Sequence, residues 1–253
     1  MNATLVINSK GGSGKTTVTT NLASYYVSRG VTTTILDYDP QGSGLNWLQL
    51  RERPGMRLYG ANAAPQRGPR IRSIEMHVPA DTRQLVIDAP AGASGLLLQE
   101  MLSRANCIVI PVAPSAFDIY ATANFVKDLL LVGRIRTRSI RLAVVANRVR
   151  SSAVYRPLER FLGSLGLPFL TRISDSEVYV RAAETGVGIF EMDASAAAAE
   201  REEFMPIVDW VGGERAPDAS AGGRIIDLAQ TRWSERNRAA LFRSELNSAS
   251  RPG

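Results

Sequence analysis

Short apolar runs alternate with amphipathic stretches over most of this chain. The apolar runs predict strands at residues 4–8, 33–37, 57–60, 85–88, 107–112, 142–146 and 168–170. The amphipathic stretches predict helices at residues 15–29, 44–51, 70–77, 94–104, 115–131, 154–165, 174–185 and 194–211. This alternation is typical of βαβ units, so we predict an α/β fold with a mostly parallel, doubly wound sheet and helices on both faces. Ligands of such sheets bind beyond the carboxyl ends of the strands.

The first apolar run leads into a glycine-rich loop that opens the first predicted helix, Lys10-Gly11-Gly12-Ser13-Gly14-Lys15-Thr16-Thr17. Its glycines let backbone N–H groups turn toward one point, and the helix N-terminus adds a partial positive charge there. Lys15 supplies a mobile cation for the β- and γ-phosphates, and the Thr16 hydroxyl is placed to ligate Mg²⁺. We therefore predict that residues 10–17 bind a nucleotide, in preference to a glycine-rich turn that binds nothing.

The start of this loop departs from the common phosphate-loop pattern. Ser9 stands where that pattern has glycine, and a second lysine, Lys10, follows it. This is the deviant Walker A form Lys-Gly-Gly-x-Gly-Lys-Thr, in which the chain resembles the ParA/MinD family of P-loop ATPases. The resemblance implies ATP and Mg²⁺ as cofactors. It also implies that Lys10 reaches across a dimer interface to the nucleotide of the other subunit, so that Lys10 and Lys15 both serve catalysis.

Carboxylates follow two of the predicted strands. The second strand ends in Asp37-Tyr38-Asp39-Pro40-Gln41-Gly42, and two carboxylates near a phosphate loop suit metal hydration and the orientation of a water. A helix cap and a turn are the alternative for this pair. The resemblance implies that Asp39 positions the attacking water and that Asp37 supports the metal site. Asp88 ends the fourth strand as in a Walker B motif and is predicted to hold Mg²⁺ through water, although many strands end in aspartate.

Two further segments follow predicted strands. Asn147 comes after the sixth strand, where its amide offers a donor and an acceptor for adenine. The family places a base contact in this region, and a turn-forming asparagine is the alternative. The segment Pro111-Val112-Ala113-Pro114-Ser115 lies at the dimer face in small ParA proteins, and Ser115 can cap the next helix.

Arginine dominates the charge of the chain. Of 30 basic residues only Lys10, Lys15 and Lys127 are lysine, and the formal net charge is +6. This excess suggests a polyanionic partner, either nucleic acid or an anionic membrane surface, although a basic surface without a partner is the alternative. Arginine clusters neutralise phosphates without reading bases, so we expect non-specific binding of double-stranded DNA. The resemblance favours Arg172 and Arg181, in the later helical region, as the DNA contacts.

Composition and the search for targeting signals bear on the domain organisation and the cellular location of the protein. Residues 1–211 read as an ATPase domain, and residues 212–253 read as a linker and a basic tail that is disordered by default. The single cysteine excludes an internal disulfide and the paired cysteines of an iron–sulfur reductase. No apolar run approaches the ~20 residues of a membrane span, and no signal peptide precedes the first strand. We therefore expect a cytoplasmic protein, and the resemblance to the ParA/MinD family implies that it associates with the nucleoid.

The resemblance extends from residue 1 to about residue 211 and is strongest to small ParA proteins, which position plasmids or protein cargos such as carboxysomes. It implies that ATP closes a sandwich homodimer, that the dimer binds DNA, and that a ParB-like or McdB-like cargo adaptor stimulates slow hydrolysis. A first alternative is a MinD-like ATPase anchored to membranes by a helix in the tail. A second is an ordinary enzyme on this fold, such as a tyrosine kinase or a ligase; the absence of tyrosine after Tyr179 disfavours the kinase.

Overall fold

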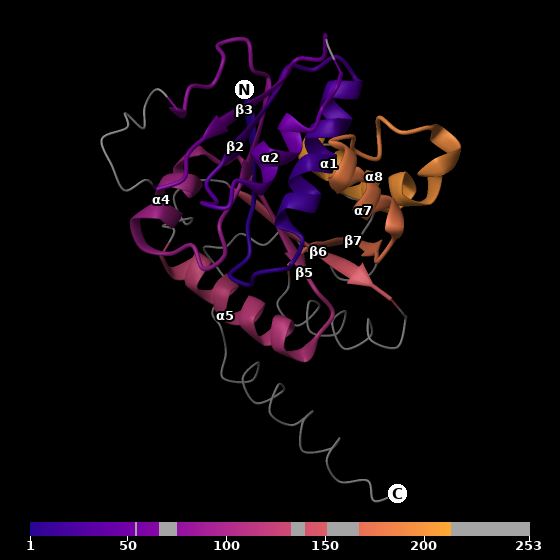
Figure 1. The fold of residues 1–253 in the computed structure, drawn as a ribbon. Coiled ribbons are helices and arrows are strands. Elements are labelled where there is room, and N and C mark those ends of the chain that lie inside the picture. Colours follow the sequence, from indigo (N-terminus) through magenta and orange to yellow (C-terminus); the bar gives the residue numbers. More distant parts are fainter. Residues whose placement is uncertain (54, 66–74, 133–139, 151–166, 214–253) are drawn as a thin grey trace, which may run out of the picture.

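The computed structural model describes residues 1–53, 55–65, 75–132, 140–150 and 167–213. It contains a seven-stranded sheet in the order β3-β2-β4-β1-β5-β6-β7 (Figure 1). Every neighbouring pair of these strands is parallel. The predicted doubly wound parallel sheet is thereby confirmed. The strands are β1 (Asn2–Val6), β2 (Thr33–Asp37), β3 (Leu58–Asn62), β4 (Gln84–Asp88), β5 (Cys107–Val112), β6 (Arg141–Val149) and β7 (Phe169–Ser174).

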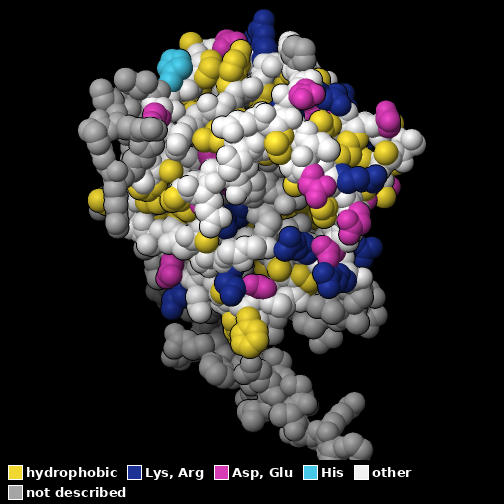
Figure 2. Space-filling model, viewed as in Figure 1, with side chains coloured by type: hydrophobic (Ala, Val, Ile, Leu, Met, Phe, Trp, Pro, Cys, Tyr) yellow, Lys and Arg dark blue, Asp and Glu magenta, His cyan; other side chains and the backbone are white. Residues whose placement is uncertain are grey.

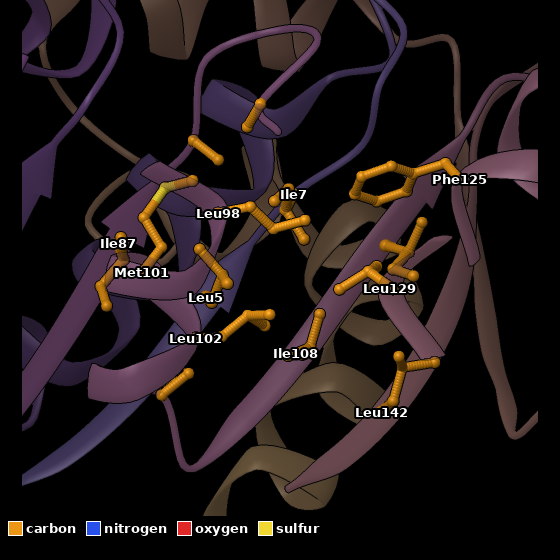
Figure 3. Packing of buried hydrophobic residues seen from close by; sticks show 14 of the residues in the cluster. Leu5, Ile7, Ile87, Leu98, Met101, Leu102, Ile108, Phe125, Leu129 and Leu142 are labelled. Atoms are coloured by element: carbon orange, nitrogen blue, oxygen red, sulfur yellow. The ribbon is translucent and has the colours of Figure 1, made fainter. Parts of the chain in front are cut away.

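Helices cover both faces of the sheet because side chains of each buried strand point alternately to the two sides. Leu5 and Ile7 face α4 (Gly95–Arg104) and α5 (Ala116–Val132), and Figure 3 shows these side chains packed together. Val6 faces the other side, where α1 (Lys15–Ser28), α7 (Glu177–Thr185) and α8 (Ala198–Gly212) pack. The short helix α2 (Ser43–Gln49) joins this second layer through Trp47. Two hydrophobic cores, one on each face of the sheet, therefore hold the central strands in place.

The predicted elements differ from the observed ones mainly in the second half of the chain. The strand expected at residues 168–170 extends to Ser174, and the helix expected from residue 174 begins at Glu177, after the cap residue Ser176. Arg172 therefore lies on a strand and not in a helical region. The reason is pairing with β6 along this segment, which no local pattern of the sequence reports. The helix expected at residues 194–211 is a 3₁₀ turn, Ala194–Ala196, followed by α8.

Some predictions fall outside the described residues. These are the helix at residues 154–165, most of the helix at residues 70–77, and the tail from residue 214 onward. The domain limit near residue 211 remains a prediction, and α8 ends close to it at Gly212. Among the helices that the structure describes, none combines the length and the apolar character that a bilayer crossing requires.

Candidate nucleotide-binding site

The loops that carry the predicted motifs gather at one edge of the sheet. All strands are parallel, so their carboxyl ends lie at the same edge. Asp37 and Asp88 are direct partners in the β2–β4 pairing, and Asp88 is also opposite Val6, the last residue of β1 before the glycine-rich loop. The tertiary structure thus places the loop and both carboxylates side by side.

The glycine-rich loop uses conformations that side chains disfavour. Gly12 and Gly14 have φ angles of 74° and 91°, in the left-handed region. Gly14 is the N-cap residue of α1 and offers no side-chain acceptor to the first N–H groups of the helix. Those groups are satisfied well by an anion, because the helix dipole also favours negative charge there. The local geometry therefore suits a phosphate group.

Lys15 is held inside this loop. Its side chain is buried, and Nζ donates a hydrogen bond to the carbonyl oxygen of Lys10 at 3.1 Å. Burial lowers the pKa of Lys15, while the negative charges of Asp88 and Asp39 act in the opposite direction. An ammonium group in such a place gains a strong partner when a phosphate enters the loop.

Lys10 has a different environment from Lys15. Its side chain is 44% exposed, and Nζ lies 3.9 Å from Oδ1 of Asp118, near the start of α5. This is the long, solvent-exposed kind of ion pair that contributes little to stability. The Lys10 side chain is therefore held only weakly, whereas its backbone accepts a hydrogen bond from Lys15 and donates one to Asn8.

Asp88 and Thr16 have the chemistry of a magnesium site. The Thr16 hydroxyl donates to Oδ2 of Asp88 at 2.8 Å, while Oδ1 of Asp88 is buried and has no hydrogen-bond partner. Burial, together with the nearby charge of Asp37, raises the pKa of Asp88 to about 7. A buried oxygen without a partner calls for an explanation, and a bound cation supplies one. Mg²⁺ takes few protein ligands beside phosphate and water oxygens, so this pair fits it.

A magnesium ion would be held by Thr16 and Asp88 and would neutralise charge on the phosphates of a nucleotide. Asp37 is placed differently. Its Oδ1 accepts the N–H of Asp39 at 2.9 Å, and its Oδ2 accepts the N–H groups of Gly44 and Leu45 at 3.0 and 3.3 Å. Asp37 thus holds the start of α2 and the turn before it, which is the cap-and-turn role that the sequence offered as the alternative. A supporting role near the metal is left untested.

Asp39 lies at the edge of the same site, half-buried, between β2 and α2. Its Oδ1 accepts the N–H of Gln41 at 3.0 Å, and its carbonyl oxygen accepts the N–H of Gly42 at 2.9 Å. These two bonds fold residues 39–42 into a tight turn. The turn therefore holds the Asp39 carboxylate at the edge of the site, and its water-positioning role remains a prediction.

Asn147 supports the phosphate loop from within the protein. It is buried, and its Nδ2 donates to the carbonyl oxygen of Ser13 at 2.9 Å. A Cβ atom on Gly14 would lie only 1.8 Å from that nitrogen, which explains why residue 14 has no side chain. The sequence did not predict this supporting role. The predicted adenine contact of Asn147 is not tested by this geometry.

Asn8 is a site residue that the sequence analysis did not assign. It is buried at the end of the first strand run, and its Nδ2 donates to the carbonyl oxygen of Pro111 at 2.7 Å and to Thr122 Oγ1 at 3.1 Å. Its Oδ1 accepts the N–H of Lys10 at 3.3 Å. Asn8 thus ties the start of the loop to β5 and α5. The available signal was a polar residue that closes an otherwise apolar run.

The predicted DNA contacts lie apart from the phosphate loop. Arg172 is exposed on the edge strand β7, and Arg181 is exposed on α7. Arg201, in the same region, instead donates to the carbonyl oxygens of Ile189 and Met192 and serves the fold. Figure 2 shows basic side chains interspersed with acidic ones on this face. Residues 134–141 hold four arginines, which are further candidates for phosphate contacts, and most of this segment falls outside the described residues.

A strand, a glycine-rich loop and a helix at the carboxyl edge of a parallel sheet, with Lys15, Thr16 and Asp88 together, define a P-loop nucleotide-binding protein. Residues 4–189 match the model of the CobQ/CobB/MinD/ParA nucleotide binding domain, and the chain belongs to this family of P-loop ATPases. The suspected relationship to ParA and MinD is thereby confirmed.

Individual relatives are similar over most of the chain. It is 27% identical over 203 residues to the maintenance of carboxysome distribution protein A of Halothiobacillus neapolitanus, covering 78% of this chain and 90% of that protein. It is 28% identical over 149 residues to Protein ParA of Rhizobium radiobacter, covering 59% of this chain and 65% of that protein. The structure of an McdA–ATP complex from Cyanothece has the same fold, with a TM-score of 0.62, 13% identity and coverage of 85% and 97%.

Proposed function

We propose that this protein is a ParA-type ATPase that positions or segregates a cargo. ATP with Mg²⁺ closes a sandwich homodimer, the dimer binds double-stranded DNA without sequence preference, and a ParB-like or McdB-like adaptor stimulates slow hydrolysis and release. The relatives that carry the names carboxysome distribution protein and ParA support a cargo of either kind, an organelle or a DNA molecule. On this proposal the protein works in the cytoplasm, on the nucleoid.

One observation carries this proposal: the phosphate loop contains two lysines in unlike environments. The Lys15 side chain is buried and bound to its own loop, whereas the Lys10 side chain is 44% exposed and lies 3.9 Å from Asp118 in a weak ion pair. A single nucleotide in this loop is served by Lys15 without Lys10. An exposed second lysine at the mouth of the site suits a phosphate that approaches from outside, on a second copy of the chain.

The first experiment tests the dimer. Purified protein is measured by light scattering with ATP, ADP or no nucleotide, and we expect a dimer with ATP alone. Lys10→Ala should bind ATP and stay monomeric. The matched control is Lys127→Ala, because Lys127 is the one lysine outside the loop and is exposed on α5. A dimer of Lys10→Ala as stable as that of the control would remove the cross-subunit role.

The second experiment tests the DNA contact. Duplexes of unrelated sequence should bind with ATP and not with ADP, and log K should fall by about 0.9 per unit of log salt for each phosphate neutralised. The charge reversals Arg172→Glu and Arg181→Glu should weaken binding equally on all duplexes. Arg57→Glu is the control, because the Arg57–Asp81 pair is exposed and Arg57 immediately precedes the opposite edge strand, β3.

A truncated variant that ends after residue 213 is measured in the same DNA-binding experiment. If only this truncation lowers DNA affinity, the tail is the contact surface and Arg172 and Arg181 are not. Sedimentation with anionic liposomes and ATP tests the MinD-like alternative. Membrane binding that depends on ATP, without DNA binding, would replace the present proposal by that one.

A further inference from the structure

Two side chains, one in α2 and one just after it, reach the C-terminal end of α7. Trp47 Nε1 donates to the carbonyl oxygen of Ala182, and Arg51 Nη1 donates to that of Gly186, both at 2.8 Å. The carbonyl groups at the end of a helix have no partner within it, so the bond to Gly186, the C-cap residue, satisfies a group that α7 leaves open. Trp47 belongs to α2, whereas Arg51 follows the C-cap residue Leu50. Side chains from α2 and from the residue just beyond its cap thus bind the C-terminal end of α7.

Arg51 also forms a buried ion pair across the same contact. Its two terminal nitrogens donate to the two carboxylate oxygens of Glu191 at 2.9 and 2.5 Å. The side chains are only 7% and 0% exposed, and the guanidinium group lies over the Trp47 ring at 5.0 Å. Buried pairs of this kind add little net stability, but they define a geometry, because either partner alone is a buried charge.

The backbones meet closely beside this pair. Gly186 has a φ angle of 66°, and a Cβ atom there would lie 2.8–2.9 Å from backbone atoms of Trp47, Leu50 and Arg51. The segment that follows is bound to α1 as well, because the N–H of Ile189 donates to Asn21 Oδ1 at 2.8 Å. The end of α7 and the loop to Glu191 therefore pack directly against the helices that follow the two nucleotide-site loops.

The other end of α2 belongs to the nucleotide site. Only Pro40, Gln41 and Gly42 separate Asp39 from the first residue of the helix. The Asp37 carboxylate accepts the N–H groups of Gly44 and Leu45, as described above. The helix is therefore a short connection between the Asp39 turn, which precedes it, and the Arg51–Glu191 pair, which follows its C-cap residue Leu50.

We propose that Arg51 is a positioning residue for Asp39: by fixing the far end of α2 on Glu191 and on the end of α7, it sets the place of the Asp39 turn and couples that place to the α7 surface. A shift of the Asp39 turn on hydrolysis then moves the end of α7, the helix that carries Arg181. This inference rests on the proposed roles of Asp39 and α7.

The test compares Arg51→Lys with Arg57→Lys. Lysine keeps the charge at position 51 but has no planar fork for two carboxylate oxygens, so α2 is less well fixed. We expect turnover at saturating ATP to fall by about tenfold or more, since small misplacements of a catalytic group are costly. The KM for ATP should stay within about twofold, because the phosphate loop is untouched. ATP-dependent DNA affinity should fall in the same variant, and Arg57→Lys should match the unaltered protein in all three.

Trp47→Phe is the second variant, and it tests the positioning role of the α2–α7 contact if Arg51→Lys does not fold. It keeps an aromatic ring under Arg51 and removes the N–H donor to Ala182, so a smaller loss of the same kind is expected. A lowered unfolding temperature with unchanged turnover and DNA binding, measured well below that temperature, would make the contact merely structural and overturn the inference. If the unaltered protein neither hydrolyses ATP nor binds DNA, the proposed function itself fails, and the inference fails with it.

Discussion

The nucleotide site and the contact between α2 and α7 both bury charged side chains, but they treat those charges differently. In the site, Asp88 Oδ1 has no partner and Lys15 has a lowered pKa because of its burial. In the contact, Arg51 and Glu191 satisfy each other with two hydrogen bonds. The first region contains a buried polar atom without a hydrogen-bond partner, whereas in the second region the buried charges are paired with each other.

This difference shows how buried charge separates a binding site from architecture. Burial of an unpaired polar group costs free energy, so a fold retains such groups where a ligand supplies the partner. A satisfied pair needs no ligand and determines instead how two elements meet. The unpartnered Asp88 oxygen therefore indicates where a cation belongs, while the Arg51–Glu191 pair indicates which elements are held together. Four predictions test this distinction.

The largest effect is expected from Lys15→Ala. The phosphate loop loses its main cation, so binding of labelled ATP should be abolished. The ligand-free protein should remain folded, because water can replace the Lys15 ammonium group as the donor to the Lys10 carbonyl oxygen. Lys127→Ala is the control and should bind ATP normally. Binding by Lys15→Ala at the affinity of the unaltered protein would refute the phosphate-loop assignment.

Asp39→Ala should separate chemistry from binding. Removal of a group that orients water typically lowers the rate by a factor of about 100 to 10,000. The loss of a negative charge beside the triphosphate should leave ATP affinity unimpaired, so the variant should accumulate as an ATP-bound dimer on DNA. ATP turnover and light scattering measure the two effects. Normal hydrolysis, or a variant that stays monomeric with ATP, would move the catalytic role to another residue, first to Asp37.

The pKa of Asp88 leads to a pH dependence of the metal-free protein. The pKa of Asp88 is about 3.8 in the unfolded chain and about 7 in the folded one, so the folded state holds this proton more tightly. The resulting contribution to stability is fully present below about pH 4, falls as the pH rises from there, and is lost once the pH has passed about 7. Urea unfolding without Mg²⁺ should show this loss. The variant Asp88→Asn should lack it, which separates Asp88 from Asp37, whose pKa burial also raises. An unchanged pH profile in Asp88→Asn would contradict the assignment.

The smallest effect is expected from Asn147→Ala. The Ser13 carbonyl oxygen loses a buried donor, which costs about 1–3 kcal/mol of stability by urea unfolding. ATP affinity should fall as well, because the phosphate loop loses its support. Asn46→Ala is a suitable control, since its amide donates to the Gln41 carbonyl in an exposed bond at 3.3 Å. A loss of ATP affinity without a loss of stability would instead favour the predicted adenine contact.

The sequence by itself determined the fold class, the phosphate loop and the Asp88 strand end. Each of these depends on a pattern among neighbouring residues. Apolar runs that alternate with amphipathic ones predict the fold class, glycines that precede Lys15 predict the loop, and an aspartate that closes an apolar run predicts the strand end. Local patterns of this kind report backbone preference and burial, which do not depend on distant partners. That is why the strand and helix order was predictable while the extent of β7 was not.

The tertiary structure alone decided which polar groups meet. Asn147 reaches Ser13 across 134 residues, and Arg51 reaches Glu191 across 140. Two further roles depend on where a side chain points. The Asp37 carboxylate accepts at the start of α2, and the Arg201 guanidinium donates to the carbonyl oxygen of Ile189. Partners that distant are selected by the packing of whole elements, and many arrangements of the same local patterns are compatible with one sequence. The nucleotide loop can therefore be predicted from neighbouring residues, whereas the contact between α2 and α7 exists only in the folded chain.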